Sequence, residues 1–315
     1  ICHSTQNAQI EIVLDGAGLF RRASVLEKVQ GLTLIPCTEA SGGRSGKKPV
    51  NHPLHDKLQY LAKDFTFWGG EVTVGFAKDP AEPYRDYLQS LLDWSAADPH
   101  PKLHAVLTYV QGGNVVADLI QAGILPVGDD GKLLKTWNAD KTAAPAIFKV
   151  LAPQQSPDDA FVRWRVEVGD DANSAPWTDE ALVASWIMHY QRSQEKTGLC
   201  MATGLQTALA VQHPAKLRHG GDKAKLISAN DSSGYTYRGR FTSDEEALGV
   251  GFVATQKAHN ALRWLIERQG YRNGDQVFVA WEPTGKTIPD PMLATFAAFG
   301  GASQDWNFGS SHADA

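Results

Sequence analysis

The chain has 315 residues, a formal net charge of −5 and a hydrophobic content of 43%. This composition is that of a folded protein, and the length exceeds one average domain. No run of about eighteen apolar residues is present, and residues 1–15 lack the charged and apolar regions of a signal peptide. We therefore expect a cytoplasmic protein without a membrane span.

The three cysteines, Cys2, Cys37 and Cys200, are odd in number and far apart in the chain. This spacing argues against a disulfide framework and offers no C-x-x-C motif for zinc. We predict that they are buried or inert thiols, and we expect no bound metal ion or cofactor.

The N-terminal region is typical of β structure. Residues 10–14 alternate in hydrophobicity, run into Asp15-Gly16-Ala17-Gly18, and the pattern resumes over 19–29, which predicts a hairpin. Residues 32–35 are a further β-prone run. A glycine loop follows over residues 38–53, and the cations of this loop are Arg44, Lys47 and Lys48. This loop is either a surface connection or, together with the basic stretch near Lys216 described below, a second element that contacts DNA.

Helical signals dominate the middle of the chain. Asp79 is the expected N-cap of a helix that has Pro80 at its first position. Further helices are predicted over 102–110 and 115–122. A proline- and aspartate-rich stretch then predicts a boundary between two lobes, residues 1–145 and residues 146–315.

The second lobe mixes strands and helices. Alternation over 161–168 predicts a strand with odd-numbered side chains on one face and even-numbered ones on the other. Thr178 is the expected N-cap of the next helix, and Ser243 with Glu246 forms a capping-box pattern before a helix that ends at Gly270. The chain as a whole predicts an α+β fold with a mixed or antiparallel sheet and several packed helices.

The stretch from Cys200 to Asn230 is the main functional signal. It holds four cations and the single carboxylate of Asp222, in a chain that is acidic overall; the cations are Lys216, Arg218, Lys223 and Lys225. Gly220 and Gly221 let the backbone approach a ligand closely, and the local positive charge attracts phosphate. The pattern suits a nucleic-acid backbone or groove; a solvated surface turn is the alternative.

A longer frame extends from this stretch. It comprises Cys200-x-x-Thr203-Gly204, His213-Pro214-x-Lys216, Ser228-x-Asn230, Tyr237-x-Gly239 and Ala258-x-Asn260-x-Leu262-x-Trp264-Leu265. Together these motifs resemble the large subunit of type I-C CRISPR interference complexes. The resemblance is tightest over residues 199–282 and extends, more thinly, to the N-terminal order of hairpin, basic loop, helices and strand.

The resemblance implies a non-catalytic subunit of an antiviral surveillance complex. In such complexes guide RNA pairs with the target, while the large subunit recognises a short flanking motif (PAM) on double-stranded DNA. It also aids strand opening and recruitment of a helicase-nuclease. The other implied partners are the CRISPR RNA with its backbone and guide-end-binding subunits, and a small helical subunit.

The residue types in the basic loops fit this implied role. Donors and close backbone can read the minor groove; the candidates are Lys216, Gly220, Gly221 and Asn230. Cations on phosphates position the duplex without specifying its sequence; the candidates are Arg44, Lys47, Lys48, Arg218, Lys223, Lys225, Arg238 and Arg240, with Tyr237 as a further contact.

The chain departs from the family at two points. Its segment between the His-Pro and Ser-x-Asn motifs is shorter than the Gly-, Gln- and Ser-rich run of family members. The family's preferred flank sequence, and its assignment of residues to bases, therefore do not carry over to this chain. Family members also continue into a helical C-terminal portion, and this chain starts at Ile1. We expect that it lacks both ends of the polypeptide.

Other chemistry has weaker support. The Thr284–Thr287 stretch resembles the end of a phosphate loop, but Ala280 stands where that motif needs glycine. The His52, His55 and Asp56 cluster could ligate a metal, although Pro53 argues against a helix that presents both histidines.

Two functional alternatives stay open. The first is a hydrolase that uses Cys200 with His213, or a metal at His52 and His55. The second is a scaffold whose basic loops bind acidic partners. Most tryptophans lie in apolar periodic sequence and are predicted to pack in the core rather than to stack on bases; those weighed are Trp68, Trp94, Trp164, Trp186, Trp264 and Trp281.

Overall fold

The computed structural model describes residues 1–44, 46–219, 221–227, 241, 248–282 and 284. The chain divides into two compact units, one of Cys2–Glu195 and one of Lys196–Ala315 together with Ile1. The lobe boundary predicted between residues 145 and 146 lies within the first unit. The mixture of helices with antiparallel and mixed sheets confirms the predicted α+β fold.

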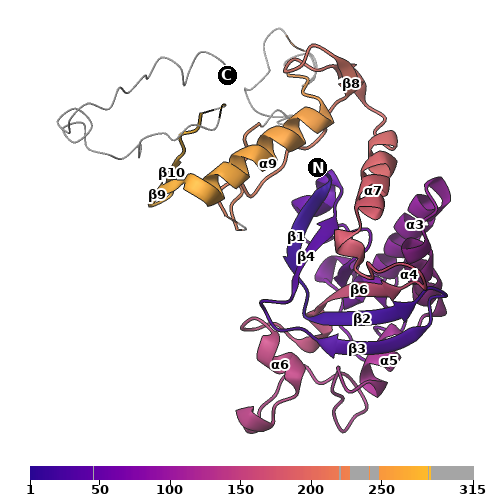
Figure 1. Cartoon of the computed structure of the whole chain (residues 1–315). Helices are drawn as coiled ribbons and strands as arrows, with labels where there is room; N and C mark the ends of the chain where they lie inside the picture. Colours follow the sequence, from indigo (N-terminus) through magenta and orange to yellow (C-terminus); the bar gives the residue numbers. More distant parts are fainter. Residues whose placement is uncertain (45, 220, 228–240, 242–247, 283, 285–315) are drawn as a thin grey trace. The chain divides into compact units, whose positions relative to one another are not determined.

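The first unit is built on a four-stranded sheet in the order β3-β2-β6-β5. Its strands are β2 (Ile10–Asp15), β3 (Phe20–Val25), β5 (Asp56–Lys57) and β6 (Phe161–Glu167). Strand β2 pairs with β3 antiparallel and with β6 parallel, and the three lie side by side in Figure 1. The long connection between the parallel strands contains most helices of the unit, as a parallel crossover requires.

Those helices are α1 (Glu39–Gly42), α2 (Leu58–Leu61), α3 (Glu82–Ala97), α4 (Pro101–Gly112), α5 (Val115–Gln121) and α6 (Ala146–Val150), and α7 (Glu180–Arg192) follows β6. Single turns of 3-10 helix lie at Val74–Phe76, Lys141–Ala143, Pro157–Asp159 and Pro176–Thr178. Helix α4 packs on β2 and β6, where the Tyr109 and Trp164 rings meet edge to face at 5.7 Å.

The predicted N-terminal hairpin is confirmed. The Asp15 carboxylate accepts hydrogen bonds from the backbone of Ala17 and Leu19, both at 2.9 Å, and so closes the turn. Gly18 takes φ 80°, and a Cβ there would lie 2.6 Å from the Ala105 carbonyl oxygen. Only glycine meets both conditions without strain.

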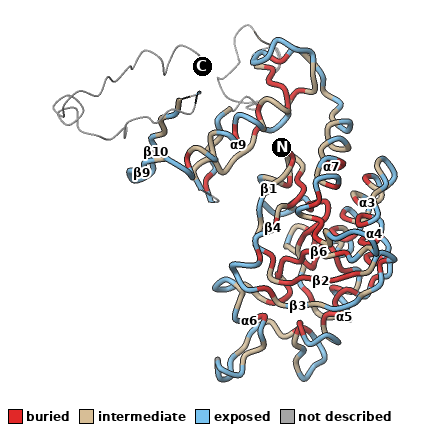
Figure 2. The backbone as a smooth tube through the Cα atoms, viewed as in Figure 1, coloured by how far each residue is buried: buried red, intermediate tan, exposed pale blue. Residues whose placement is uncertain are grey.

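Strand β6 shows the predicted alternation. Val162, Trp164 and Val166 are fully buried on the core face, and the tube is red along most of β2 and β6 in Figure 2. Arg163, on the other face, is also only 6% exposed. Its guanidinium bonds Glu11 on the neighbouring strand at 2.8 Å, so burial of this charge is compensated.

Two predicted helix caps are wrong. Helix α3 starts at Glu82 with Ala81 as its N-cap, and Asp79 instead accepts a bond from the Ala81 backbone in the preceding turn. Helix α7 is capped by Asp179, whose carboxylate accepts bonds from the first turn. Thr178 belongs instead to the preceding 3-10 turn, and Asp179 also pairs with the buried Lys102 ammonium.

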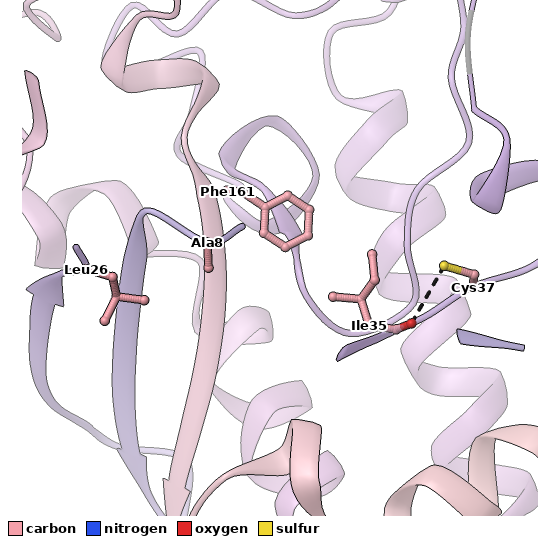
Figure 3. Close-up of a cluster of buried hydrophobic side chains, with 5 residues drawn as sticks. All are labelled: Ala8, Leu26, Ile35, Cys37 and Phe161. Carbon is pink, nitrogen blue, oxygen red and sulfur yellow. Dashed lines mark hydrogen bonds between the residues drawn. The ribbon is translucent and has the colours of Figure 1, made fainter. Parts of the chain in front are cut away.

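A separate ribbon of β1 (His3–Asn7) and β4 (Leu32–Pro36) pairs antiparallel. It contributes to a buried cluster with the start of β6, drawn in Figure 3, that comprises Ala8, Leu26, Ile35, Cys37 and Phe161. Cys2, Cys37 and Cys200 are all buried thiols, as predicted. Burial raises the pKa of the Cys2 thiol to about 11, which leaves it protonated and inert at neutral pH.

The second unit is smaller in regular structure. Its described elements are two antiparallel hairpins and one long helix: β7 (Thr197–Leu199) with β8 (Gln206–Ala208), β9 (Tyr271–Asn273) with β10 (Gln276–Phe278), and α9 (Phe252–Gln269). Gly270 is the C-cap of α9, as predicted. The capping box predicted at Ser243 and Glu246 lies outside the described residues.

Candidate nucleic-acid interface

The β7–β8 hairpin anchors the segment that leads into residues 213–225, called the basic loop from here on. Within it the Cys200 backbone donates to the Leu205 carbonyl at 2.9 Å. A third segment runs alongside, because Met201 bonds Gly249 and Ala210 bonds Val250. The chain therefore enters the loop from a fixed three-segment base.

Cys200 lies inside this base and is fully buried. A hydrogen bond from the Thr203 hydroxyl and others from nearby backbone amides, that of Gly251 included, lower the pKa of its thiol to about 7. His213, the predicted alternative base, pairs through Nδ1 with the Thr255 hydroxyl at 2.9 Å. Across the described residues no hydrogen bond joins Cys200 to His213, so the geometry brings together no nucleophile and base here.

An Arg218–Asp222 clasp shapes the basic loop. The Arg218 guanidinium bonds both carboxylate oxygens at 2.9 Å, and the same carboxylate accepts the backbone amides of Arg218 and Ala224. The Arg218 side chain and these amides hold the pKa of Asp222 well below its usual range. The single acid of the loop is therefore ionised, and its carboxylate is hydrogen-bonded within the loop itself.

The same arginine fixes the loop to the β9–β10 hairpin. Arg218 donates through Nη1 to the Asp275 carbonyl, and Arg272 donates through Nη2 to the Arg218 carbonyl at 2.8 Å. These two bonds run in opposite directions between the same two segments. The loop and the hairpin consequently form one structural element.

Three cations of the loop remain available. Lys223 is exposed, and Lys216 and Lys225 are half-buried. In the part of the chain that the structure describes, none of the three forms an ion pair. Lys216 takes φ 65°, a left-handed conformation that non-glycine residues rarely adopt. Strain of this kind concentrates at functional sites.

The outcome for the remaining residues predicted in this loop is mixed. Gly221 is exposed beside the clasp. The other five lie outside the described residues: Gly220, Asn230, Tyr237, Arg238 and Arg240. Their predicted roles stay predictions.

The glycine loop of the first unit is held by its own partners. Arg44 makes a two-pronged ion pair with the fully buried Asp56, at 2.7 and 2.8 Å, and its guanidinium lies 5.2 Å from the centre of the Tyr60 ring. Lys48 pairs with Glu82 at 2.8 Å. Lys47 is exposed, and its carbonyl accepts a hydrogen bond from the Gly75 amide at 3.0 Å. Arg44 thus has a structural role, as the partner of a buried carboxylate.

The His52, His55 and Asp56 cluster is also used internally. His55 accepts the Trp164 backbone amide at Nδ1 at 3.1 Å, and Asp56 is taken by Arg44. No group of three or more His, Cys, Asp and Glu side chains within the described ranges lies close enough together to hold a metal ion.

His55 predicts a pH dependence of stability. Burial, with the charge of Arg163 as a smaller cause, lowers its pKa from 6.5 to about 3. A histidine with a depressed folded pKa stabilises the fold fully above pH 6.5, and this contribution is lost as the pH falls from 6.5 towards 3. At pH 5 we expect a loss of about 2 kcal/mol in the free energy of unfolding.

Denaturant unfolding at pH 7.5 and pH 5 measures this loss. His55→Asn is the matched variant, because its amide oxygen can still accept the Trp164 amide while no group there titrates. It should be less stable at pH 7.5 but should lose about 2 kcal/mol less than the parent on acidification. Equal acid sensitivity of the two proteins would show that His55 does not titrate as described.

The sequence interpretation missed the β9–β10 hairpin as part of the site. The Asn273-Gly274-Asp275 turn between two β-prone runs was the available signal, and Gly274 takes φ 57° in it. Trp264 and Trp281 were predicted to lie in the core, but they are 53% and 47% exposed. Trp94, Trp164 and Trp186 are buried as predicted.

Two further findings concern the chain as a whole. Among the described residues, no helix combines the length and hydropathy needed to cross a bilayer. No curated protein matches the sequence, whereas the sequence model of the family described as CRISPR-associated protein (Cas_Csd1) matches residues 1–312. Because this match spans nearly the whole chain, the protein belongs to the Cas_Csd1 family of CRISPR-associated, Cascade-type proteins.

Proposed function

We propose that this protein is the large subunit of a type I-C CRISPR surveillance complex and that its basic loop recognises the PAM on target double-stranded DNA. It does so without a catalytic centre of its own, as one component of a complex with CRISPR RNA and other subunits. Binding at the flank then aids strand opening and recruitment of a helicase-nuclease.

One observation carries this proposal. The loop consumes its only carboxylate in the Arg218–Asp222 clasp and leaves Lys216, Lys223 and Lys225 without an ion pair in the described structure. A loop with this charge distribution attracts the phosphates of DNA from a distance. Because the loop is tied to the β9–β10 hairpin, it presents these charges in a fixed arrangement.

The three lysines have different roles in this proposal. Lys216 lies at the strained backbone position and carries a hydrogen-bond donor, the kind of group that reads the acceptors on the floor of the minor groove. Lys223 and Lys225 flank the end of the clasp and are placed to neutralise phosphates, which contributes affinity and register but no sequence preference.

Duplex binding by the assembled complex tests the proposal. Replacing Lys216, Lys223 and Lys225 with alanine should weaken binding and reduce its salt dependence. For each phosphate contact that is lost, binding releases about 0.9 fewer counterions from the DNA. We expect the slope of log K against log salt to fall by about 2 to 3. Gel shifts at several salt concentrations give this slope.

A matched triple variant is the control. Lys28, Lys78 and Lys149 are exposed cations of the first unit that form no ion pair in the described structure, and their replacement removes the same charge. This control should leave the slope unchanged. If both triple variants lower the slope equally, the effect is one of net charge and the loop is not the DNA site.

Randomised flanking bases test the specific role of Lys216. The parent complex should enrich a subset of flanks, and Lys216→Ala should broaden that subset, whereas Lys223→Ala should weaken all flanks alike. An unchanged flank preference in Lys216→Ala would remove this lysine from recognition.

A further inference from the structure

The β9–β10 hairpin presents two aromatic rings on one face. Tyr271 and Phe278 are directly paired across the strands, so their side chains project from the same side of the hairpin. Their ring centres are 6.5 Å apart, with 47° between the planes. They are 44% and 41% exposed.

The opposite face of the hairpin makes the contacts with the rest of the second unit, although Arg272 is exposed and Val277 is half-buried. Arg272 and Val277 form the neighbouring cross-strand pair and therefore project to the other side. Arg272 reaches the Arg218 carbonyl of the basic loop, and Val277 lies against Gly270 at the end of α9, 3.0 Å from where a Cβ would stand. These contacts hold the hairpin in place without involving Tyr271 or Phe278.

Exposure of two adjacent rings is unfavourable in water. Burying an aromatic side chain is worth about 1.5–3 kcal/mol, so an outward aromatic pair indicates a binding surface. The bonds from Arg218 to Asp275 and from Arg272 to Arg218 tie the hairpin that carries this pair to the loop that carries Lys216, Lys223 and Lys225. The element therefore combines ring faces with unpaired positive charge.

That combination favours an unpaired nucleic-acid strand as the occupant. Single strands bind where cations track the phosphates and aromatic rings stack on successive bases. Within a duplex the bases stack on one another and present only their edges in the grooves. Stacking on Tyr271 and Phe278 therefore requires bases that have left the duplex.

We propose that Tyr271 and Phe278 form a stacking platform for bases of the DNA strand that become unpaired next to the flank bound by the basic loop. This inference rests on the proposed function, since it presumes that the loop brings duplex DNA to this element. It adds a step in which freed bases are captured, which opposes re-closure of the duplex.

Two DNA substrates separate this step from flank recognition. Both carry a preferred flank and no target sequence for the guide. One is fully paired, and the other has a mismatched bubble beside the flank that contains 2-aminopurine. The protein is used within its assembled complex, with affinity and 2-aminopurine fluorescence as readouts.

The main variant is Tyr271→Ala with Phe278→Ala. It should bind the paired duplex within about twofold of the parent, and its affinity for the bubble should drop by about tenfold or more, because each base–aromatic stack contributes that order of affinity. Quenching of 2-aminopurine by the parent should disappear. The exchange Tyr271→Phe with Phe278→Tyr should restore both, while the leucine pair Tyr271→Leu with Phe278→Leu should not.

Several results would overturn the platform. Unchanged bubble affinity in the alanine pair would do so, as would full function in the leucine pair. A folded alanine variant that fails to join the complex would show instead that this face binds a protein subunit. If the alanine pair does not fold, the parent alone decides the question: bubble binding without quenching refutes stacking.

Failure of the proposed function would look different. In that case the complex would bind a paired duplex with the preferred flank no better than one with an altered flank. This would hold for the parent and for every variant at positions 271 and 278. Loss of bubble binding with paired-duplex binding intact can arise only from the platform.

Discussion

Replacing Arg44 with alanine is expected to lower the free energy of unfolding of the first unit by about 3–5 kcal/mol, the usual cost of removing one partner of a buried ion pair. Asp56 is fully buried and depends on Arg44 for two of its hydrogen bonds. Without the guanidinium the carboxylate keeps only the backbone amides of His52 and Lys57. Urea unfolding of the parent and the variant measures the difference.

The pH dependence of this variant supplies a second readout. Burial already raises the pKa of Asp56, against the opposing charge of Arg44, and loss of that charge raises it further. An acid with a raised folded pKa favours the folded state as the pH falls. The deficit of Arg44→Ala should therefore narrow between pH 7 and pH 5.

Lys47→Ala is the control for a role in DNA binding. Lys47 belongs to the same loop and is exposed, so its removal should change stability by less than about 0.5 kcal/mol. An Arg44→Ala protein as stable as the parent, with weakened DNA binding, would contradict the structural role and return Arg44 to the set of phosphate contacts.

Glu11→Gln is expected to have a comparable effect, about 3–5 kcal/mol. Glu11 is 8% exposed and is the shared partner of two arginines of β6, Arg163 at 2.8 Å and Arg165 at 3.0 Å. Both guanidinium groups lie over the Trp177 ring, at 4.1 and 5.0 Å from its centre. Neutralising Glu11 leaves two adjacent like charges between a tryptophan and an amide.

The same sheet offers a matched surface pair for comparison. Arg22 on β3 bonds Glu167 on β6 at 2.7 Å, but the side chains are 60% and 44% exposed. Water screens such a pair, so Arg22→Ala should cost less than about 1 kcal/mol. Thermal and urea unfolding of both variants tests the contrast, and similar losses would show that burial of Glu11 is not what makes its ion pairs important.

Local patterns predicted much of the backbone. The hairpin at residues 10–25, the faces of β6, the end of α9 at Gly270 and the burial of the cysteines all follow from periodicity, turn residues and residue type. Asp15 illustrates why: its carboxylate closes the turn through amides two and four residues away. Interactions of this range are visible in a linear sequence.

The candidate site was predicted only as a set of charges. Sequence indicated four cations and one acid between residues 213 and 225, but it did not distinguish Arg218, which is bound to Asp222 and Asp275, from the three lysines without an ion pair. The same holds for Arg44, because its partner Asp56 lies twelve residues away across an irregular loop. Residue type shows that a charge exists and not what it pairs with.

By itself the amino-acid sequence determined the α+β composition, the concentration of positive charge near Lys216 and the motifs of a CRISPR-associated family. Tertiary structure alone decided which cations form ion pairs, that Trp264 is exposed, and that Tyr271 and Phe278 share an exposed face of a hairpin bonded to the basic loop. The physical reason is range. Backbone preferences act over a few residues, whereas a charge or a ring acquires its role from neighbours that folding brings from distant parts of the chain.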